Sequence, residues 1–441
     1  MTSESGGGLP MAAAPQPGPA PPPAPEFVGR WKAHVPLDPR NFPHQERRSG
    51  TIPCTILNVE FLLVNNDIDV RYDVVRKKTV INLPGWEGSP DNMDNVAMAI
   101  IVSLAEANNM QRSGIEEQVL AIGDRNMFNP AADWIGSKPW DGEDRLPAFY
   151  QTLTTEEEFP TDLKEVLIRK WLLSIVAAAF MPRNFKARGV LTLQGEQGLG
   201  KSTWVASLVS DPVVREMIVK LDHHLDPHDK DSVLSAISHL IVEVGELDSS
   251  FRKDIARLKG FITRDSDKVR RPYARTASEY PRRTVFVATV NDRNFLVDDT
   301  GNSRFWTLPL VGVDYRHTVD MQQLFAQLHA DFVAGAQWWL TREEETRLAS
   351  SNRDHQAISP IREALIELID EKQSGPVSME VMGTNDVLAK LGIEYPRNGQ
   401  NKEVAAVLRE LLGQPKRING NMKWRIPFRR AAPGSSVVNL W

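Results

Sequence analysis

The sequence contains almost no cysteine. Cys54 is the only one in 441 residues, which excludes a disulfide scaffold and the Cys-rich zinc modules and favours a reducing compartment. Long apolar runs are also missing: the longest, Trp171–Met181, is too short to cross a bilayer, so no membrane partner is expected. No basic segment followed by an apolar one opens the chain. We therefore expect no secretory signal and a cytoplasmic protein.

An excess of positive charge is missing too. The 52 Lys and Arg residues face 57 Asp and Glu residues, and the net charge of −5 argues against a protein that coats nucleic acid. The length and the 41% hydrophobic content are typical of a globular chain with two or three domains. The expected parts are a proline-rich tail over 1–26, a mixed and mainly helical domain over 27–155, an α/β domain over 156–348, a small domain over 355–430 and a tail over 431–441.

Short β-rich runs alternate with helical stretches in the central part of the chain. The runs lie at 190–194, 217–221, 239–247 and 284–291, after an apolar helix at 164–180. Such alternation predicts an α/β fold with a mostly parallel sheet and helices on both faces. A polar stretch at 350–354 then indicates a linker.

The N-terminal part shows weaker signals. Residues 72–83 have the apolar bias of a hairpin, and residues 95–108 have the periodicity of an amphipathic helix. A second helix is expected from Ser113, because Ser113 and Glu116 have the spacing of a capping box, and it should end before Pro130.

The segment 195–202 reads GEQGLGKS and matches the phosphate-loop pattern between a predicted strand and a predicted helix. Its glycines allow backbone N–H groups to turn inward around a β-phosphate. Lys201 is expected to reach the β- and γ-phosphates, and the Ser202 hydroxyl to bind Mg²⁺. The alternative is an ordinary glycine-rich turn. The predicted nucleotide-binding residues are Gly195, Gly198, Gly200, Lys201, Ser202 and Thr203.

A phosphate loop needs an acid for Mg²⁺ and a group that positions the attacking water. Glu243 and Glu246 lie in and after a buried strand, where an unpaired carboxylate is costly. We assign Glu243 to the metal and Glu246 to the water, although these roles could be exchanged. One of the two could instead only flank the strand, and Asp248 is a further acid.

Two polar residues follow at positions suited to catalysis. Asn291 comes directly after the strand 284–290 and could sense the γ-phosphate or hold the water. Arg304 precedes two large aromatic residues and could reach a neighbouring subunit's nucleotide as an arginine finger. The alternatives are a turn-forming asparagine and a surface ion pair.

The acidic total conceals two basic segments. Residues 252–283 contain eleven Lys and Arg against four Asp and Glu. Cations alternate with an aromatic residue there, which suits a loop that contacts DNA. Some of these arginines could instead bridge subunits. The predicted DNA contacts are Lys268, Arg270, Arg271, Tyr273 and Arg275.

The second basic segment, 397–430, contains nine Lys and Arg against two Asp and Glu. Helices at 384–390 and 402–412 precede a hairpin at 416–427, which is a winged-helix order. We predict a duplex- or origin-binding module; the alternative is a packing domain with a solvated basic face. The predicted contacts are Lys416, Arg417, Lys423 and Arg425. A further cluster, His223, His224 and His228 among aspartates, is read as a solvated loop because nothing rigid fixes a metal geometry.

Several of these segments recur in one order in a known family. The sequences GEQGLGKST, IVEVGELD, RRPYAR, VFVATVN and DDTGNSRFW follow one another, after NPAADWIGSKPWDGEDRL at 129–146. Over about residues 90–310 the chain resembles the virulence-associated E family. These are replication proteins of phages and mobile elements, related to superfamily III helicases of the AAA+ type.

The resemblance implies an AAA+ P-loop ATPase core between a mainly helical N-terminal domain and a winged-helix-like domain. It implies a homo-oligomer, as a hexameric ring, that hydrolyses ATP with Mg²⁺ in a bacterial host cell and translocates on single-stranded or forked DNA or at an origin. The hairpin between the acidic strand and the sensor strand would bind DNA. The implied roles are Walker A for Lys201 and Ser202, Walker B for Glu243 and Glu246, sensor 1 for Asn291 and the finger for Arg304.

Larger relatives carry a separate primase module; we expect none here, because the N-terminal part offers room for only a 26-residue tail and some 120 mixed residues. Two alternatives to a helicase stay open. One is a DNA-bound ATPase switch that does not unwind DNA, and the other is a small-molecule P-loop kinase.

Overall fold

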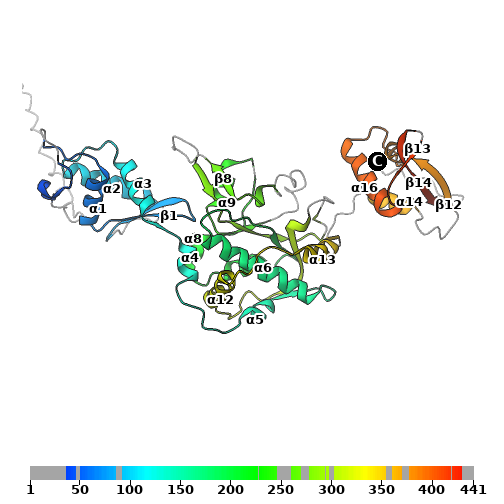
Figure 1. Cartoon of the computed structure of the whole chain (residues 1–441), viewed down its shortest axis with the longest axis horizontal. Helices are drawn as coiled ribbons and strands as arrows, with labels where there is room; N and C mark the ends of the chain where they lie inside the picture. Colours follow the sequence, from blue (N-terminus) through cyan, green and yellow to red (C-terminus); the bar gives the residue numbers. More distant parts are fainter. Residues whose placement is uncertain are drawn as a thin grey trace, which may run out of the picture. The chain divides into compact units, whose positions relative to one another are not determined.

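The structure is a computed structural model. It describes residues 36–45, 50–85, 92–226, 228–245, 260–269, 278–293, 295–296, 302–353, 360–369, 377–418 and 420–429. The chain divides into two compact units, the first formed from 1–71 and 79–126 and the second from 72–78 and 127–441. Figure 1 shows their elements along the chain.

The first unit is mainly helical. Its helices are α1 (Ile56–Asn65), α2 (Met93–Ala107) and α3 (Ile115–Arg125), and their apolar faces share one hydrophobic core. The predicted capping box at Ser113 is wrong. Gly114 adopts a left-handed conformation with φ 91° and precedes the helix, so no side chain caps it.

The predicted hairpin is present but begins earlier. Its strands are β1 (Asp69–Asp73) and β2 (Lys78–Asn82). The turn forms without an Asn-Gly pair. The Asp73 carboxylate holds it by accepting hydrogen bonds from the N–H groups of Val75 and Arg76, each at 2.9 Å. An aspartate side chain thus forms the turn in place of a glycine pair.

The second unit is built on a six-stranded sheet in the order β4-β11-β5-β10-β7-β6. β4 is antiparallel to β11 and the other pairs are parallel, so the predicted α/β class is confirmed. The strands are β4 (Leu153–Thr155), β5 (Val190–Gln194), β6 (Val219–Lys220), β7 (Ile241–Val244), β10 (Val285–Val290) and β11 (Phe305–Val313).

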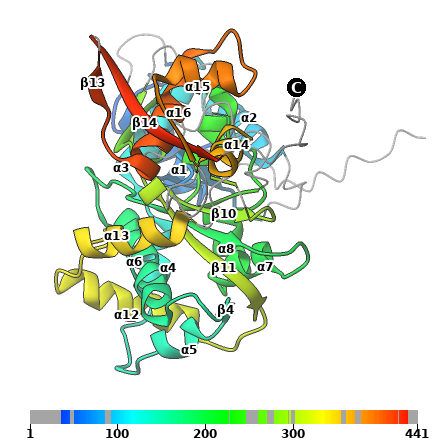
Figure 2. The same cartoon turned by 90° about the vertical axis from the view of Figure 1, so that its right-hand side faces the viewer.

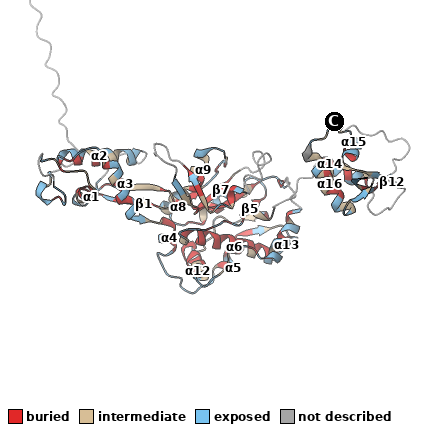
Figure 3. Cartoon of the chain, turned by 45° about the horizontal axis from the view of Figure 1, so that its top comes forward, coloured by how far each residue is buried: buried red, intermediate tan, exposed pale blue. Residues whose placement is uncertain are grey.

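Both faces of this sheet are covered. In β10, Val285 and Val287 pack into one hydrophobic core, whereas Phe286 and Ala288 pack into another. Side chains alternate across a strand, so two cores on alternate positions require a cover on each face. Helix α6 (Thr161–Phe180) covers the first face, and Figure 3 shows its residues as largely buried.

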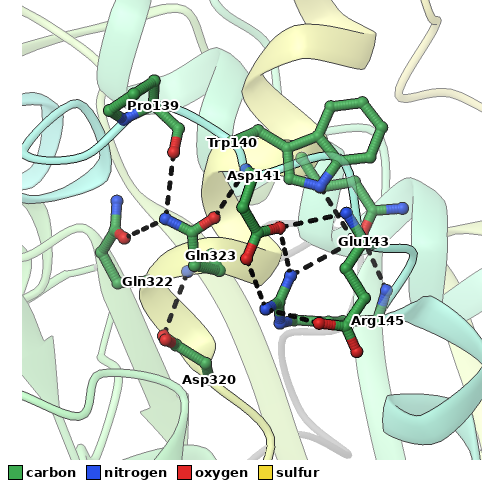
Figure 4. A network of polar contacts seen from close by, with 9 residues as sticks. Pro139, Trp140, Asp141, Glu143, Arg145, Asp320, Gln322 and Gln323 are labelled. Atoms are coloured by element: carbon green, nitrogen blue, oxygen red, sulfur yellow. Dashed lines mark hydrogen bonds and ion pairs between the residues drawn. The ribbon is translucent and has the colours of Figure 1, made fainter.

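Helix α12 (Met321–Val333) packs against α6, and α4 (Pro130–Ile135) lies beside both, as Figures 1 and 2 show. The loop that follows α4 is held on α12 by side-chain amides (Figure 4). Gln323 donates to the Pro139 carbonyl at 3.1 Å and accepts from the Asp141 N–H at 2.9 Å. The Arg145 guanidinium binds both Asp141 oxygens at 2.7 Å and lowers the pKa of that carboxyl to about 2. This exposed loop therefore has a fixed conformation.

Two element boundaries differ from the prediction. Only part of the run 217–221 is a strand. Asp211 caps helix α8 (Pro212–Ile218), and this helix takes up the first two residues of the run, directly before β6. Helix α13 (Arg342–Asn352) occupies 350–352, where a linker was predicted. Its capping box, Thr341 with Glu344, starts a helix that the strongly charged sequence did not reveal.

The C-terminal module has a hydrophobic core of its own. Its order is α14 (Pro360–Leu368), β12 (Val377–Met382), α15 (Thr384–Lys390), α16 (Asn398–Leu412), β13 (Lys416–Ile418) and β14 (Asn421–Arg429). The hairpin β13–β14 is present as predicted. β12 adds a third antiparallel strand to it, in the order β12-β14-β13.

In the ranges that the structure covers, no helix combines the length and apolar character that a membrane span needs.

Candidate functional site

A cavity of about 450 Å³ lies at the carboxyl edge of the six-stranded sheet. In a parallel sheet this edge is where ligands bind, because the loops that leave the strands converge there. We call it the carboxyl-edge cavity. Its lining residues are Gln197, Gly198, Leu199, Gly200, Lys201, Ser202, Thr203, Asp222, Glu243, Gly245, Thr289, Asn291 and Tyr315.

The predicted phosphate loop connects β5 to helix α7 (Lys201–Ser207). Gly198 and Gly200 both have φ 87°, a conformation that residues with a Cβ rarely adopt. A Cβ on Gly200 would also lie 2.3 Å from Cδ1 of Tyr315. The loop path therefore requires glycine at Gly200 for two independent reasons.

Lys201 is buried and held by neutral oxygens. Its Nζ donates to the carbonyls of Gly195 and Glu196 at 2.6 and 2.8 Å and to Oδ1 of Asn291 at 3.0 Å. Burial lowers the pKa of this amine, and the charge of Glu243 partly opposes that effect. The structure thus places Lys201 and Asn291 in direct contact at the cavity.

Glu243 is 1% exposed and lies at the centre of a hydrogen-bond network. Its Oε1 accepts from the hydroxyls of Ser202 at 2.5 Å and Thr289 at 2.9 Å, and its Oε2 accepts from the Asp222 N–H at 3.2 Å. Three donors compensate the burial of this carboxylate. Glu243 consequently fixes the orientation of the Ser202 hydroxyl.

The predicted site residues are brought together only in part. Lys201, Ser202, Thr203, Glu243 and Asn291 all line the carboxyl-edge cavity. Gly198 and Gly200 line it too, and the Gly195 carbonyl binds Lys201. Glu246 lies outside the described residues, so the division of roles between the two glutamates stays a prediction.

Arg304 lies at the opposite edge of the sheet. It ends the short helix η4 (Asn302–Arg304), directly before β11. Phe305 pairs with Val190, the first residue of β5, whereas the phosphate loop follows the last residue, Gln194. Within one chain, Arg304 is therefore far from the cavity that Lys201 lines.

Outside the phosphate loop, sequence reasoning missed four residues of the cavity: Asp222, Gly245, Thr289 and Tyr315. Asp222 follows β6, Thr289 lies inside β10 and Tyr315 follows β11. Thr289 has the appearance of an ordinary strand residue, and Asp222 was grouped with the nearby histidines. A signal was available for Asp222, because a polar residue after each parallel strand reaches the same edge of the sheet.

The residues present fit a Mg²⁺ ion only together with a nucleotide. Among the described residues, no group of three or more His, Cys, Asp or Glu side chains could hold a metal. The Ser202 hydroxyl, with its proton donated to Glu243, offers an oxygen lone pair to a cation. Mg²⁺ is commonly held in this way by one or two protein oxygens, substrate phosphates and water.

The predicted DNA contacts of the ATPase domain lie on a hairpin. Lys268 is exposed on β8 (Ser266–Val269), which pairs with β9 (Ser278–Pro281). Lys268 lies opposite Glu279, so its charge is partly balanced on the same face. The other predicted contacts, Arg270, Arg271, Tyr273 and Arg275, lie outside the described residues.

The predicted contacts of the C-terminal module lie on its hairpin. Lys416 pairs directly with Lys423, and Arg425 follows two positions later on the same face of β14. Trp424 and Ile426 occupy the alternate positions and are buried in the core of the module. Arg417 lies on the other face, opposite Met422, so three of the four predicted cations share one surface.

The chain was compared with curated proteins, solved structures and family models. No curated protein matches the chain. Among solved structures, the apo C-terminal region of NrS-1, residues 305–718, matches at 15% identity and a TM-score of 0.34, covering 85% of this chain and 98% of that one. The A form of this region gives a TM-score of 0.38 at the same identity and coverage. These scores are too low to establish a common fold.

The family comparison is the informative one. The model of the virulence-associated protein E-like domain matches residues 135–357, which is just over half of the chain. The matched range contains the whole carboxyl-edge cavity and all six strands of the sheet. The chain therefore belongs to the virulence-associated protein E-like family.

Proposed function

We propose that this chain is a replication protein of a phage or mobile element that hydrolyses ATP in the carboxyl-edge cavity. The observation that carries the proposal is the convergence of Lys201, Ser202 and Glu243 on that cavity. A buried amine held by three neutral oxygens is suited to exchange them for phosphate oxygens.

The residues of the cavity have separate tasks in this proposal. Lys201 binds the β- and γ-phosphates, and Glu243 holds the Ser202 proton so that the Ser202 oxygen faces Mg²⁺. Bound Mg²⁺ would neutralise charge on the phosphates. Asn291 is released when Lys201 turns to the phosphates, and its amide then holds the attacking water, which Glu246 activates.

The finer fold assignment is an AAA+ core. The strand order supports it, because β5 with the phosphate loop lies directly beside β10 with Asn291, and β7 with Glu243 follows. A nucleotide at the end of β5 is thereby placed next to the amide and the acid that hydrolysis requires.

The proposed assembly is a ring, as a hexamer. Arg304 supports it, because the residue lies at the sheet edge opposite its own cavity and is therefore placed to serve a neighbouring subunit. Mixing Arg304→Ala subunits with Glu246→Gln subunits should restore part of the hydrolysis, since each mixed interface can combine an intact finger with an intact acid. No recovery in rings shown to mix would contradict the role in trans.

The proposed partner is DNA, single-stranded, forked or at an origin. The cations Lys416, Lys423 and Arg425 on one face of the C-terminal hairpin support it. ATP hydrolysis and strand displacement should be measured with and without forked DNA. Hydrolysis that DNA stimulates, with displacement, is the expected result; stimulation without displacement would favour an ATPase switch, and no hydrolysis would contradict the proposal.

A further inference from the structure

Two carboxylates line the carboxyl-edge cavity, and they differ in how they are used. Glu243 is buried and accepts three hydrogen bonds from Ser202, Thr289 and Asp222. Asp222 is exposed to the cavity, and among the described residues no donor binds its carboxylate oxygens. The protein therefore satisfies one acid internally and leaves the other available to whatever enters.

The position of Asp222 is fixed by its neighbours. Its N–H donates to Oε2 of Glu243, and the next N–H, of His223, donates to the Glu243 carbonyl at 2.9 Å. These bonds tie the end of β6 to the end of β7. Asp222 is thus held beside Glu243, at the same edge of the sheet as Lys201 and Ser202.

The space in front of Asp222 is kept open by a glycine. A Cβ on Gly245 would lie 2.5 Å from Oδ1 of Asp222, so any other residue there would displace the carboxylate. Asp222 also has φ 48°, which an aspartate tolerates better than most residues. The carboxylate is therefore held at the cavity wall.

A magnesium–nucleotide in this cavity would bring waters as well as phosphates. Mg²⁺ gives up its waters reluctantly and keeps several when it binds a nucleotide. Ser202 is the hydroxyl that the proposed function assigns to the ion, so the waters that the ion keeps need acceptors from the cavity wall. A carboxylate with unoccupied oxygens is the strongest acceptor available for them.

We propose that Asp222 is a second carboxylate of the magnesium–nucleotide site and accepts hydrogen bonds from waters of the bound ion. The assignment rests on the proposed function and adds a residue to it. It predicts that Asp222 strengthens binding of the metal complex and, by its charge, weakens binding of a nucleotide without metal.

The test is a titration of the whole chain with a fluorescent ADP analogue, at increasing Mg²⁺ and again in EDTA. Asp222→Asn retains the side-chain shape and tolerates the positive φ. We expect the Mg²⁺ concentration for half-maximal binding to rise about tenfold, which is typical for loss of an outer-sphere partner. Affinity without metal should stay equal or improve. The spectrum of bound Mn²⁺ with ADP should change in the variant, independently of hydrolysis.

Two variants separate this role from a structural one. Asp222→Gly removes the carboxylate at a position whose positive φ suits glycine, so the loop conformation should be kept while half-maximal binding still requires about tenfold more Mg²⁺. Asp226→Asn lies in the same loop but does not line the cavity, and should match the wild type.

The assignment is overturned if Asp222→Asn binds within twofold of the wild type at every Mg²⁺ concentration. It is equally overturned if affinity falls alike with and without metal, because that result indicates a damaged loop. A wild-type chain that binds no nucleotide, or a Lys201→Ala variant that binds normally, would instead contradict the proposed function, and the role of Asp222 would fall with it.

Discussion

A buried basic residue lies near each end of strand β10, and different partners hold the two residues. Past its carboxyl end, Lys201 contacts two carbonyls and the Asn291 amide beside an open cavity. Ahead of its amino end, Arg282 binds Asp267 through two hydrogen bonds of 2.5 and 2.6 Å. Arg282 is 1% and Asp267 3% exposed.

The difference indicates which end acts on a ligand. Arg282 is paired with a full opposite charge, its guanidinium lies 4.4 Å from the ring centroid of Phe261, and its backbone N–H binds the Asp265 carbonyl. This pair holds the two ends of the hairpin β8–β9 together and leaves little for a ligand to gain. Lys201 has only neutral partners, so an incoming phosphate offers it a stronger interaction.

The largest expected effect concerns Lys201, at the end of β10 that faces the carboxyl-edge cavity. Lys201→Ala should reduce ATP hydrolysis by about 10³-fold, because it removes a charge aimed at the transferring phosphate. Folding should be preserved, since burial of this amine lowers its pKa and is not a source of stability. Steady-state hydrolysis and thermal melting measure the two effects; near-normal turnover would refute the site.

At the other end of β10, breaking the Arg282–Asp267 pair should reduce stability. Asp267→Ala leaves the Arg282 charge buried without its partner and should cost about 3–5 kcal/mol of unfolding free energy. Urea unfolding measures the loss. The matched control is Asp265→Ala, which breaks an ion pair with Lys186 that solvent screens and should therefore cost far less. Equal losses in the two variants would contradict the structural role of the buried pair.

A smaller effect is expected in the loop at the open end. Gly200→Ala adds a Cβ against Tyr315 at a positive φ, and overpacking of this kind typically costs about 1–3 kcal/mol. Here the cost should weaken nucleotide affinity, which a binding titration measures. Gly413→Ala, also at positive φ but with no atom near the new Cβ, should leave affinity unchanged. If both variants bind nucleotide alike, the contact with Tyr315 is not what requires glycine.

The smallest effect is a pH dependence of the nucleotide-free protein. The pKa of Lys201 is lowered below its ordinary value of 10.5 by folding. Between the lowered and the ordinary pKa, the unfolded chain binds more protons than the folded one, so this residue makes stability rise with pH. As the pH rises through the alkaline range, the unfolding free energy of the wild type should therefore increase relative to that of Lys201→Met. A difference that stays constant with pH would contradict the burial effect.

The sequence predicted best what is encoded locally. β5, the phosphate loop and the start of α7 were correct because the whole signal lies within residues 190–208. The hairpin β13–β14 was correct because Gly420 permits its tight turn. Patterns of this kind depend on a few neighbouring residues.

The parts that were missed depend on residues distant in sequence. Asp222 belongs to the cavity only because β6 pairs with β7. This pairing brings Asp222 beside Glu243, which lies twenty-one positions later in the sequence. β12 is a strand because β14 pairs with it. The Arg282–Asp267 pair exists because a hairpin brings its two ends together. No local periodicity contains such information.

Calorimetric titration of the wild type and of Lys201→Ala with Mg²⁺ and ADP shows whether the carboxyl-edge cavity is a nucleotide site. We expect one nucleotide per wild-type chain, no detectable binding to Lys201→Ala, and the same melting behaviour in both proteins without nucleotide. A wild-type chain that binds no nucleotide, or a variant that binds as tightly as the wild type, would contradict this assignment.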